Sequence, residues 1–400
     1  MFVLPALAFS QDSVEAPKSV LIAPFENLSK APGIEWIGES FPDVMGQRLS
    51  AESWTMLSRA ERLNAFDRAG MPAGRHPSRA TIFRVAEQLD VDYVVLGSYN
   101  FDGQTFLASC QWLDVKRARL SQRMTESGPL PRLIDVQTGL AWDILRLSDP
   151  ALTASRDAFV AAAPPIRLDS LENYTRGVLA GSSADKIKYF HEAVRINSAY
   201  SEAQFALGQA YFATKQYDPA AAALAKVPAT HAAGGQAQFL LGLCEFYLGH
   251  FDKAEIAFTG LAARVPLPEV YNNLGVAQAR RGHTAAADQF QRANETDPGD
   301  PDYSFNLAVA LSRAGDATGA THALRESLAA NPGDTEARGM MESLVAASDP
   351  KFAANAEPVK TPMERIKRSY DEDAFRQIAA QLQRTLAAKL AEKAQRLPKP

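Results

Sequence analysis

The sequence predicts three consecutive parts: an α/β or α+β sheet domain in residues 17–150, an all-α solenoid in residues 165–346, and a C-terminal helix in residues 362–400. Three observations lead to this prediction. Short, strongly apolar runs before residue 150 are typical of buried strands. Beyond residue 200, a pair formed by leucine and a small residue recurs at a nearly constant period. The last part has apolar residues near helical spacing, and 400 residues suffice for separate cores.

Residues 1–16 are expected to be a truncated export signal, without a basic start, and a short linker. The run Phe2–Phe9 is apolar, and Ala8-Phe9-Ser10 resembles a cleavage site with small residues around a larger one. A signal would place the protein in the periplasm or associated with the cell envelope. The alternative is an uncleaved apolar end and a cytoplasmic protein. No stretch reaches the ~20 apolar residues of a transmembrane helix, so no membrane span is expected.

Residues 17–150 are expected to alternate strands and helices. Apolar or alternating runs predict the strands, and one-sided apolar spacing predicts the helices. The expected strands are 19–23, 54–57 and 93–96, with a hairpin of 104–115 and 119–125, and the expected helices are 37–49, 59–69, 78–89 and 131–147. Ser78 stands where it would cap the third helix. This order of elements fits a layered sheet domain.

The solenoid is predicted from a repeated unit. The pairs Leu207-Gly208, Leu241-Gly242, Leu274-Gly275 and Leu307-Ala308 follow one another at intervals of 34, 33 and 33 residues. Each pair is followed by a small residue and, four places later, a large apolar one: Ala220 and Leu224, Ala254 and Phe258, Ala286 and Phe290, Ala320 and Leu324. Small residues let two helices approach closely, and proline or turn clusters close most units. The third unit is one residue short before Ala286, which predicts a tightened turn.

A period near 34 residues with this content resembles the tetratricopeptide repeat, a hairpin of two helices. A degenerate unit beginning near Tyr174 precedes the four clear ones, so about five repeats are expected over residues 165–346. Such hairpins must stack, because none of them buries its apolar face alone. The resemblance implies a surface that binds other proteins or peptides.

The N-terminal part resembles a second family over three short blocks. These are Pro-Phe-Glu-Asn-Leu-Ser at 24–29, Glu-Trp-Ile-Gly-Glu-Ser-Phe at 35–41 and Tyr-Val-Val-Leu-Gly-Ser-Tyr at 93–99. They look like the TolB amino-terminal-like domain, which is similar in fold to curli-secretion and flagellar-assembly lipoproteins. In many bacterial chains this domain precedes tetratricopeptide repeats. The resemblance implies a binding or assembly module without catalytic residues.

Composition gives no indication of an enzyme. The net charge of −4 argues against a general nucleic-acid binder, which usually carries a basic face. The two cysteines, Cys110 and Cys244, lie in different predicted parts, so no disulfide framework is expected. The six histidines show no zinc-site spacing. We therefore predict no catalytic residue, no metal ligand and no cofactor.

Two further patterns have plain structural interpretations. The nearest approach to phosphate-binding loops is made by Gly97-Ser98, Gly181-Ser182 and Gly234-Gly235. None has the spacing that such loops require, and each is predicted to be a turn. Glu35 and Glu39 stand one helical turn apart, and we expect solvated acids that favour the start of a helix.

The array offers candidate binding residues on its concave face, which the first helix of each hairpin lines. Asn273 and Asn306 occupy equivalent positions, and Arg280 and Arg313 follow them by seven residues on the same helix face. An asparagine can pair with a peptide main chain and an arginine with a carboxylate. Similar tetratricopeptide proteins hold extended peptides with asparagines at this position. Expected aromatic contacts come from Tyr271, Phe239, Phe246, Phe205 and Phe212. The alternative is that these residues only cap turns, face solvent or pack between hairpins.

The C-terminal part divides in two. Residues 347–361 are rich in alanine, proline and lysine and predict a linker. The tail at 362–400 is expected to be helical from Pro362 to Ala394. Its basic face, including Arg365 and Lys367, would suit anionic lipid at a membrane surface. Docking of the helix on the array or on the sheet domain is the preferred interpretation.

Together these patterns predict a non-enzymatic adaptor or scaffold of the bacterial envelope. It would bind segments of other proteins through the concave face of the repeats, without a nucleic-acid partner. The alternative is a regulatory module that senses a small ligand in a pocket of the N-terminal domain.

Overall fold

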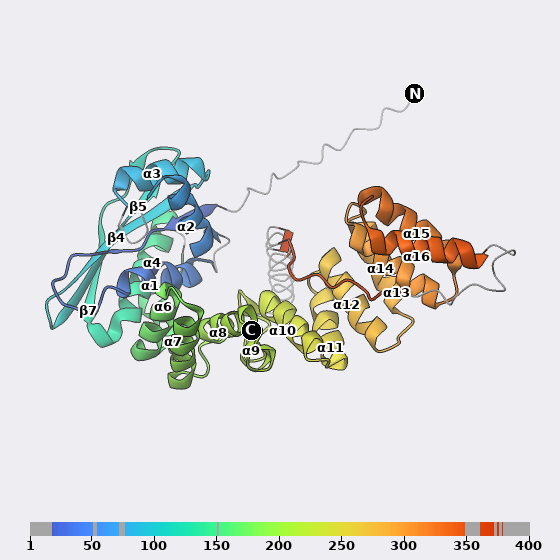
Figure 1. The fold of residues 1–400 in the computed structure, drawn as a ribbon. Coiled ribbons are helices and arrows are strands. Elements are labelled where there is room, and N and C mark those ends of the chain that lie inside the picture. Colours follow the sequence, from blue (N-terminus) through green and yellow to red (C-terminus); the bar gives the residue numbers. More distant parts are fainter. Residues whose placement is uncertain are drawn as a thin grey trace, which may run out of the picture. The chain divides into compact units, whose positions relative to one another are not determined.

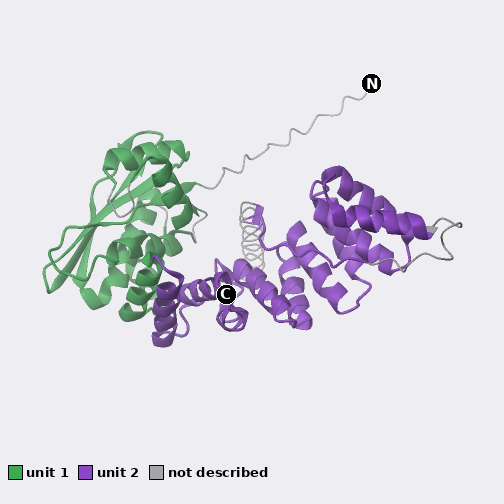
Figure 2. Cartoon of the chain, in the orientation of Figure 1, with its two compact units in different colours: residues 1–180 green, residues 181–400 purple. Residues whose placement is uncertain are grey.

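The computed structural model describes residues 18–50, 54–71, 77–149, 152–348, 361–371, 374–375 and 378. The chain divides into two compact units, residues 1–180 and residues 181–400 (Figure 2). The first unit contains a mixed sheet, and the second begins a run of consecutive helices (Figure 1). The predicted fold class is therefore confirmed. The division lies at residue 180, so the first helix of the degenerate repeat falls within the first unit.

The described part of the first unit holds a seven-stranded sheet with helices on both faces. Strands β1, β3 and β4 are parallel, β2 extends the parallel pairing to β4, and β5 pairs antiparallel with β4, β6 and β7. The strands are β1 Ser19–Ile22, β2 Glu26–Asn27, β3 Thr55–Met56, β4 Tyr93–Phe101, β5 Thr105–Asp114, β6 Arg119–Leu120 and β7 Met124–Pro129. The helices are α1 Ile37–Leu49, α2 Arg59–Arg68, α3 Arg79–Gln88, η2 Leu130–Arg132, α4 Leu133–Ser148, α5 Arg156–Ala161 and α6 Leu168–Leu179.

Strand β4 shows why this sheet is covered on both faces. Its residues alternate sides, as in any strand. Val94 and Leu96 are buried in one cluster with residues of α3, whereas Tyr99 stacks with Phe41 of α1 and Phe106 of β5. The prediction of a turn at Gly97-Ser98 is wrong, because both residues lie within β4. Glycine is required at position 97 because a Cβ atom there would collide with the ring of Phe25.

The acid Glu39 also differs from its prediction. Its carboxylate is not solvated but accepts hydrogen bonds from Arg59, at 2.8 Å, and from Arg62. Arg62 is buried and donates to the carbonyl of Ile22 at 3.1 Å. Burial lowers the pKa of Arg62, and the charge of Glu39 opposes that effect. Because a buried guanidinium needs a charged partner, Glu39 stabilises the packing of α2 against the sheet.

The second unit is built from helical hairpins. Each of the four clear repeats forms one antiparallel pair: α8 with α9, α10 with α11, α12 with α13, and α14 with α15. The bounds are α7 Ser183–Ile196, α8 Ser201–Ala213, α9 Tyr217–Leu224, α10 Gly234–Tyr247, α11 Phe251–Ala262, α12 Pro268–Arg280, α13 Ala286–Thr296, α14 Pro301–Arg313, α15 Ala317–Ala330 and α16 Thr335–Ser348. The prediction of a tightened turn before Ala286 is wrong, because five residues separate α12 from α13, whereas three separate the two helices in each of the other clear repeats. The missing residue is accommodated by α13, which begins only at Ala286.

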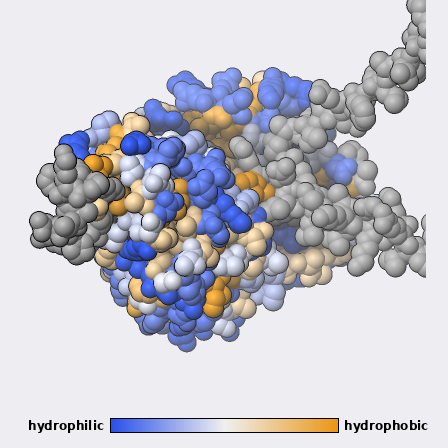
Figure 3. Space-filling model, turned by 90° about the vertical axis from the view of Figure 1, so that its right-hand side faces the viewer, coloured by the Kyte–Doolittle hydropathy of each residue, from blue (hydrophilic) through white to orange (hydrophobic). Residues whose placement is uncertain are grey.

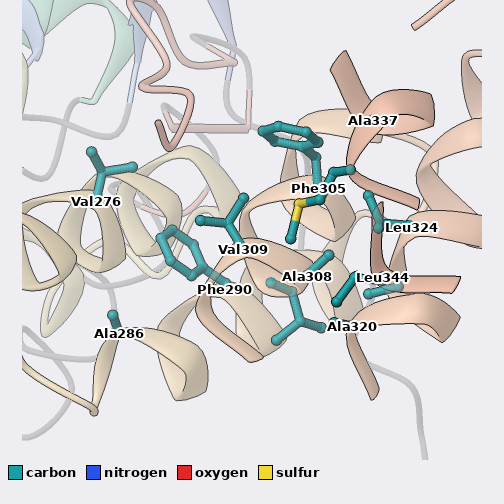
Figure 4. Packing of buried hydrophobic residues seen from close by; sticks show 13 residues of the cluster. Val276, Ala286, Phe290, Phe305, Ala308, Val309, Ala320, Leu324, Ala337 and Leu344 are labelled. Atoms are coloured by element: carbon teal, nitrogen blue, oxygen red, sulfur yellow. The ribbon is translucent and has the colours of Figure 1, made fainter. Parts of the chain in front are cut away.

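Glycine allows the two helices of a hairpin to pack closely. A Cβ atom on Gly242 or Gly275 would collide with the ring of Phe258 or Phe290 in the partner helix. The fourth repeat has Ala308 at this position, in one core cluster with Leu324. Figure 4 shows how side chains of α12 to α16 interdigitate in that cluster. The glycine or alanine of each repeated pair is therefore the place where the two helices of a hairpin pack against each other.

The face shown in Figure 3 is mostly hydrophilic or intermediate, with hydrophobic residues in small groups. Among the described helices, none combines the length and the apolar character needed to cross a bilayer.

Candidate protein-interaction site

Three asparagines on the first helices of neighbouring hairpins carry the site. Asn272 and Asn273 lie on α12, and Asn306 lies on α14, just before the leucine of the repeated pair. All three side chains are fully buried. A buried amide without partners costs about 1–3 kcal/mol, so these residues need acceptors and donors close to them.

Their partners are main-chain groups of the C-terminal tail. Asn306 donates to the carbonyl of Arg365 at 2.8 Å and accepts from its N–H at 2.7 Å. Asn273 forms the same pair of bonds with Lys367, both at 2.8 Å. Asn272 donates a further bond to the carbonyl of Arg365 and accepts one from Asn306. Two equivalent asparagines thus hold two alternate residues of one extended strand.

We call residues 361–371, with Ala374, Phe375 and Ile378, the tail segment. It lies beside α12 as the orange-red trace in Figure 1. The residues of the array that contact its main chain or pair with its charges form the recognition face: Glu269, Asn272, Asn273, Arg280, Asp300, Asp302, Asn306, Arg313, Asp334 and Glu336.

The prediction of a helix starting at Pro362 is wrong for residues 362–371, which have no helical structure. The asparagines occupy the N–H and C=O groups of Arg365 and Lys367, which a helix would need for its own hydrogen bonds. A helical turn begins only after Asp371, whose side chain accepts from the N–H of Ala374 at 2.9 Å. The rest of the expected helix lies outside the described residues.

An acidic side chain anchors the start of the tail segment. The side chain of Glu364 has no exposed surface and is paired with Arg280, at 3.5 Å, and with Arg313. Arg313 also donates to the carbonyl of Pro362 at 3.2 Å. Both arginines are residues that the sequence singled out for carboxylate binding, and the structure brings them to one carboxylate. The burial of Glu364 is stable because two cations face it.

Basic side chains of the tail segment meet acids of the array. Arg365 pairs with Asp334 at 2.6 Å, with Asp302 at 3.1 Å and with Glu336 at 2.9 Å. Partial burial lowers the pKa of Arg365, but hydrogen bonds to these acids outweigh it and raise the pKa. The pKa of Asp334 is held low, first of all by its hydrogen bond from Arg365. The charges therefore stabilise one another.

Lys367 repeats this arrangement one hairpin away. Its Nζ lies 2.6 Å from Asp300 and 2.7 Å from Asp302. The two cations also lie over aromatic rings of α14: Arg365 at 3.6 Å from the ring centroid of Phe305 and Lys367 at 5.1 Å from that of Tyr303. Cation–π contacts of this kind add to charge pairing.

Aromatic residues hold the far end of the tail segment. Tyr370 packs edge-on against Phe239, with ring centroids 4.8 Å apart, and Phe375 packs against Gly235. Phe239 thus contacts the tail segment. Phe246 lies under Arg280 and packs against the same two core clusters as Ile366 of the tail segment. The ring of Tyr271, by contrast, lies beside Arg292 of α13. Phe205 and Phe212 pack in the core around α9.

Asn272 and the acids of the recognition face are not among the binding residues that the repeat pattern indicated. Asp300 and Asp334 follow the turns Asp297-Pro298-Gly299 and Asn331-Pro332-Gly333, which indicated only the ends of helices. Both acids accept backbone hydrogen bonds at the start of the next helix, α14 or α16, and also bind the tail segment. A Pro-Gly-Asp repeated in two successive units was the available signal.

A second feature is a cavity of about 1050 Å³ in the first unit, lined among others by Trp54, Tyr93, Trp112 and Asp143. The rings of Tyr93 and Trp112 stack at 4.5 Å, and Trp54 lies 5.1 Å from Trp112. Burial raises the pKa of Asp143 to about 6, and the charge of Glu126 adds to that rise.

Groups suited to chemistry are sparse in the part of the chain that the structure describes. There, no cluster of three or more His, Cys, Asp or Glu side chains is arranged to hold a metal ion. Burial raises the pKa of the Cys110 thiol and raises that of Cys244 to about 12, so both stay protonated at neutral pH.

Comparisons with known proteins agree on the repeats. Residues 182–244, 239–301 and 276–335 match family models described as tetratricopeptide repeats. The chain therefore contains these repeats. The matches do not reach residues 17–150, so the resemblance of that part to the TolB amino-terminal-like domain stays a prediction. No curated protein matches the chain.

Solved structures similar to the chain align with less than half of it. YrrB, described as a tetratricopeptide protein with an unusual peptide-binding site, is 19% identical with a TM-score of 0.41, over 44% of this chain and 92% of its own. MamA from Desulfovibrio magneticus RS-1 is 18% identical with a TM-score of 0.37, over 42% and 95%. A thermophilic tetratricopeptide protein from Thermus thermophilus is 17% identical with a TM-score of 0.32, over 44% and 98%.

Proposed function

We propose that this protein is a non-enzymatic adaptor of the bacterial envelope that holds an extended segment of a partner protein on the concave face of its repeats. The observation that carries the proposal is the pair of two-bond contacts from Asn273 and Asn306 to alternate residues of a bound strand. Main-chain contacts of this kind are available to any extended peptide, and ion pairs beside them add selectivity.

A labelled peptide tests this function directly. The probe is a fluorescein-labelled peptide with the sequence of residues 361–380, and the protein is the full chain with Arg365→Glu and Lys367→Glu, which face the acids Asp302 and Asp334. These changes weaken docking of the chain's own tail segment through like-charge repulsion. We expect saturable binding by fluorescence anisotropy.

Adding Asn273→Ala and Asn306→Ala removes four main-chain hydrogen bonds to the strand. At about 0.5–1.5 kcal/mol for each bond, binding should weaken by about 30-fold or more. These buried changes also affect folding. A second test therefore leaves the protein intact and changes the probe: Glu364→Gln removes the charge that pairs with Arg280 and Arg313. The same affinity for all probes and variants would contradict the proposal.

The envelope location is the part of the proposal that rests on sequence. Phe2–Phe9 and the small residues around Phe9 support an export signal. A fusion of residues 1–30 to alkaline phosphatase, which is active only after export, tests it. Because the expected signal lacks its basic start, a second fusion carries Met-Lys-Lys before Phe2. If both fusions were inactive in a bacterial host, the proposed export would be contradicted.

The cavity in the first unit supports a second candidate, a ligand-sensing module. The stacked rings of Tyr93 and Trp112, with the tilted ring of Trp54 beside them, would hold a flat apolar group. Arg119 and Arg146 line the same cavity and would pair with an anion. Small aromatic carboxylates should then quench tryptophan fluorescence and raise the melting temperature of the first unit. A Trp112→Leu variant should lose both effects.

A further inference from the structure

We infer that the tail segment is an internal competitor, which keeps the recognition face closed until a partner displaces it. The partner would be a protein segment with the same order of side chains: acidic, basic, apolar, basic, and an aromatic residue three positions later. This inference rests on the proposed function and names its ligand. It follows from three properties of the bound tail segment.

The first property is that the array contacts the tail segment as it would contact a separate peptide. The tail segment is held by main-chain bonds at Arg365 and Lys367, by ion pairs and by two aromatic rings. It runs from α16 back toward α10, against the order of the repeats, as shown by Arg365 on Asp334 and Phe375 on Gly235. Every one of these contacts is open to an extended segment of another chain.

The second property is the order of charges on the recognition face. Arg280 and Arg313 of the array both pair with one acid of the tail segment, Glu364. The acids at the starts of α14 and α16 pair with its two basic residues, Lys367 and Arg365. A strand with the opposite charge order would place like charges together at each position. Because like-charge contacts oppose binding, the face selects the order acidic, basic, apolar, basic rather than basic segments in general.

The third property is the short connection. Only residues 349–360 join α16 to the tail segment. A tether of this length gives an effective concentration on the order of 1 mM. If the free segment bound with a Kd of ~10 µM, the face would be open about 1% of the time, and an external ligand would bind ~100-fold more weakly. The closed state therefore needs no tight contact, and a partner of higher affinity can open it.

The experiment compares the fluorescein-labelled 361–380 probe on two full-length proteins. One is the wild type, and the other carries Arg365→Glu and Lys367→Glu, which leave the recognition face unchanged. We expect the probe to bind the variant at least ~10-fold more tightly than the wild type, since its competitor is weakened. A matched control, Lys188→Glu with Arg325→Glu, makes the same charge change at exposed positions and should behave as wild type.

The outcomes separate the two proposals. If the variant does not bind the probe, the proposed function fails. If it binds but the wild type binds equally well, the function stands and the internal competitor is excluded. A second probe with Glu364→Arg, Arg365→Glu and Lys367→Glu tests charge order on the variant. Loss of binding supports the stated ligand, whereas equal binding would overturn the selectivity.

Discussion

At the scale of single residues, the buried asparagines of the array depend on main-chain groups of the tail segment. Asn273 and Asn306 are completely buried, yet their amides point at main-chain groups distant in sequence. Such side chains weaken a core that could have used leucine, unless a strand satisfies them. The tail segment supplies this strand, and its main-chain groups offset the cost of burying both amides.

Asp143 provides a residue-scale prediction for the first unit. Its folded-state pKa is raised to about 6, so the folded state holds a proton that the unfolded state releases near pH 4. The stability that this carboxyl contributes is therefore present at low pH and falls as pH rises from about 4 to 6. Asp143→Asn should stabilise the unit at pH 8 by about 1 kcal/mol, which is the ~3 kcal/mol of the full shift reduced for solvent screening. It should have little effect at pH 4.

Urea unfolding followed by tryptophan fluorescence measures this effect in the full chain. All four tryptophans, Trp36, Trp54, Trp112 and Trp142, belong to the first unit, so the signal reports that unit alone. Asp157→Asn, at a carboxylate with 99% side-chain exposure, is the control. A stabilisation that is equal at pH 4 and pH 8 would show that the charge of Asp143 is not its cause.

At the scale of elements, some helical glycines allow a neighbouring helix to pack closely, and others face open space. Gly275→Ala places a Cβ atom against the ring of Phe290 inside a hairpin. Overpacking of about 1–3 kcal/mol should exceed the gain of up to ~1 kcal/mol in helix propensity, so the array loses stability. Gly339→Ala on α16 meets no atom within 4 Å and should gain stability.

Circular dichroism at 222 nm during urea unfolding gives both values, because the array dominates the helical signal. The two variants make the same chemical change, so their difference isolates the contact with Phe290. If both variants were stabilised to the same extent, close packing at the repeated glycine would not matter for stability.

Elements were predictable from the sequence where local patterns agree with tertiary contacts. Ser78 caps α3 as expected, and the repeated leucine–glycine pairs mark the first helices of the hairpins. The start of the tail was not predictable in this way. Ile366 and Tyr370 stand at helical spacing, but the asparagines of α12 and α14 provide better hydrogen-bond partners for this backbone than a helix of its own. Tertiary contacts then override local propensity.

At the scale of the molecule, the site combines parts that sequence reasoning treats separately. Asn273 and Arg280 were identifiable from their place in the repeat, and they do lie on the recognition face. Their bound strand comes from residues about 90 positions later, and no local pattern reveals such a pairing. Docking on the array or on the sheet domain was the preferred interpretation of the tail, with a lipid surface as the alternative. Arg365 and Lys367 pair with acids of the array.

The tether between array and tail segment leads to a prediction for the whole chain. Inserting 24 glycine and serine residues between Ala354 and Asn355 triples the twelve-residue connection 349–360. Effective concentration falls with about the −3/2 power of tether length, hence about five-fold. The 361–380 probe should bind this protein about five-fold more tightly than wild type, although the recognition face and the tail segment are unchanged. The same 24 residues added after Pro400 should have no effect.

Tether length separates an exchangeable ligand from a permanent part of the array. A permanently docked tail would not respond to the insertion at Ala354, because its contacts and not its connection would hold it in place. An exchangeable tail must respond, because its occupancy is the product of its own affinity and the concentration that the tether imposes. Tail variants such as Arg365→Glu change only the first factor, and the insertion changes only the second. If both raise probe affinity and their effects multiply, the chain regulates its own recognition face by competition.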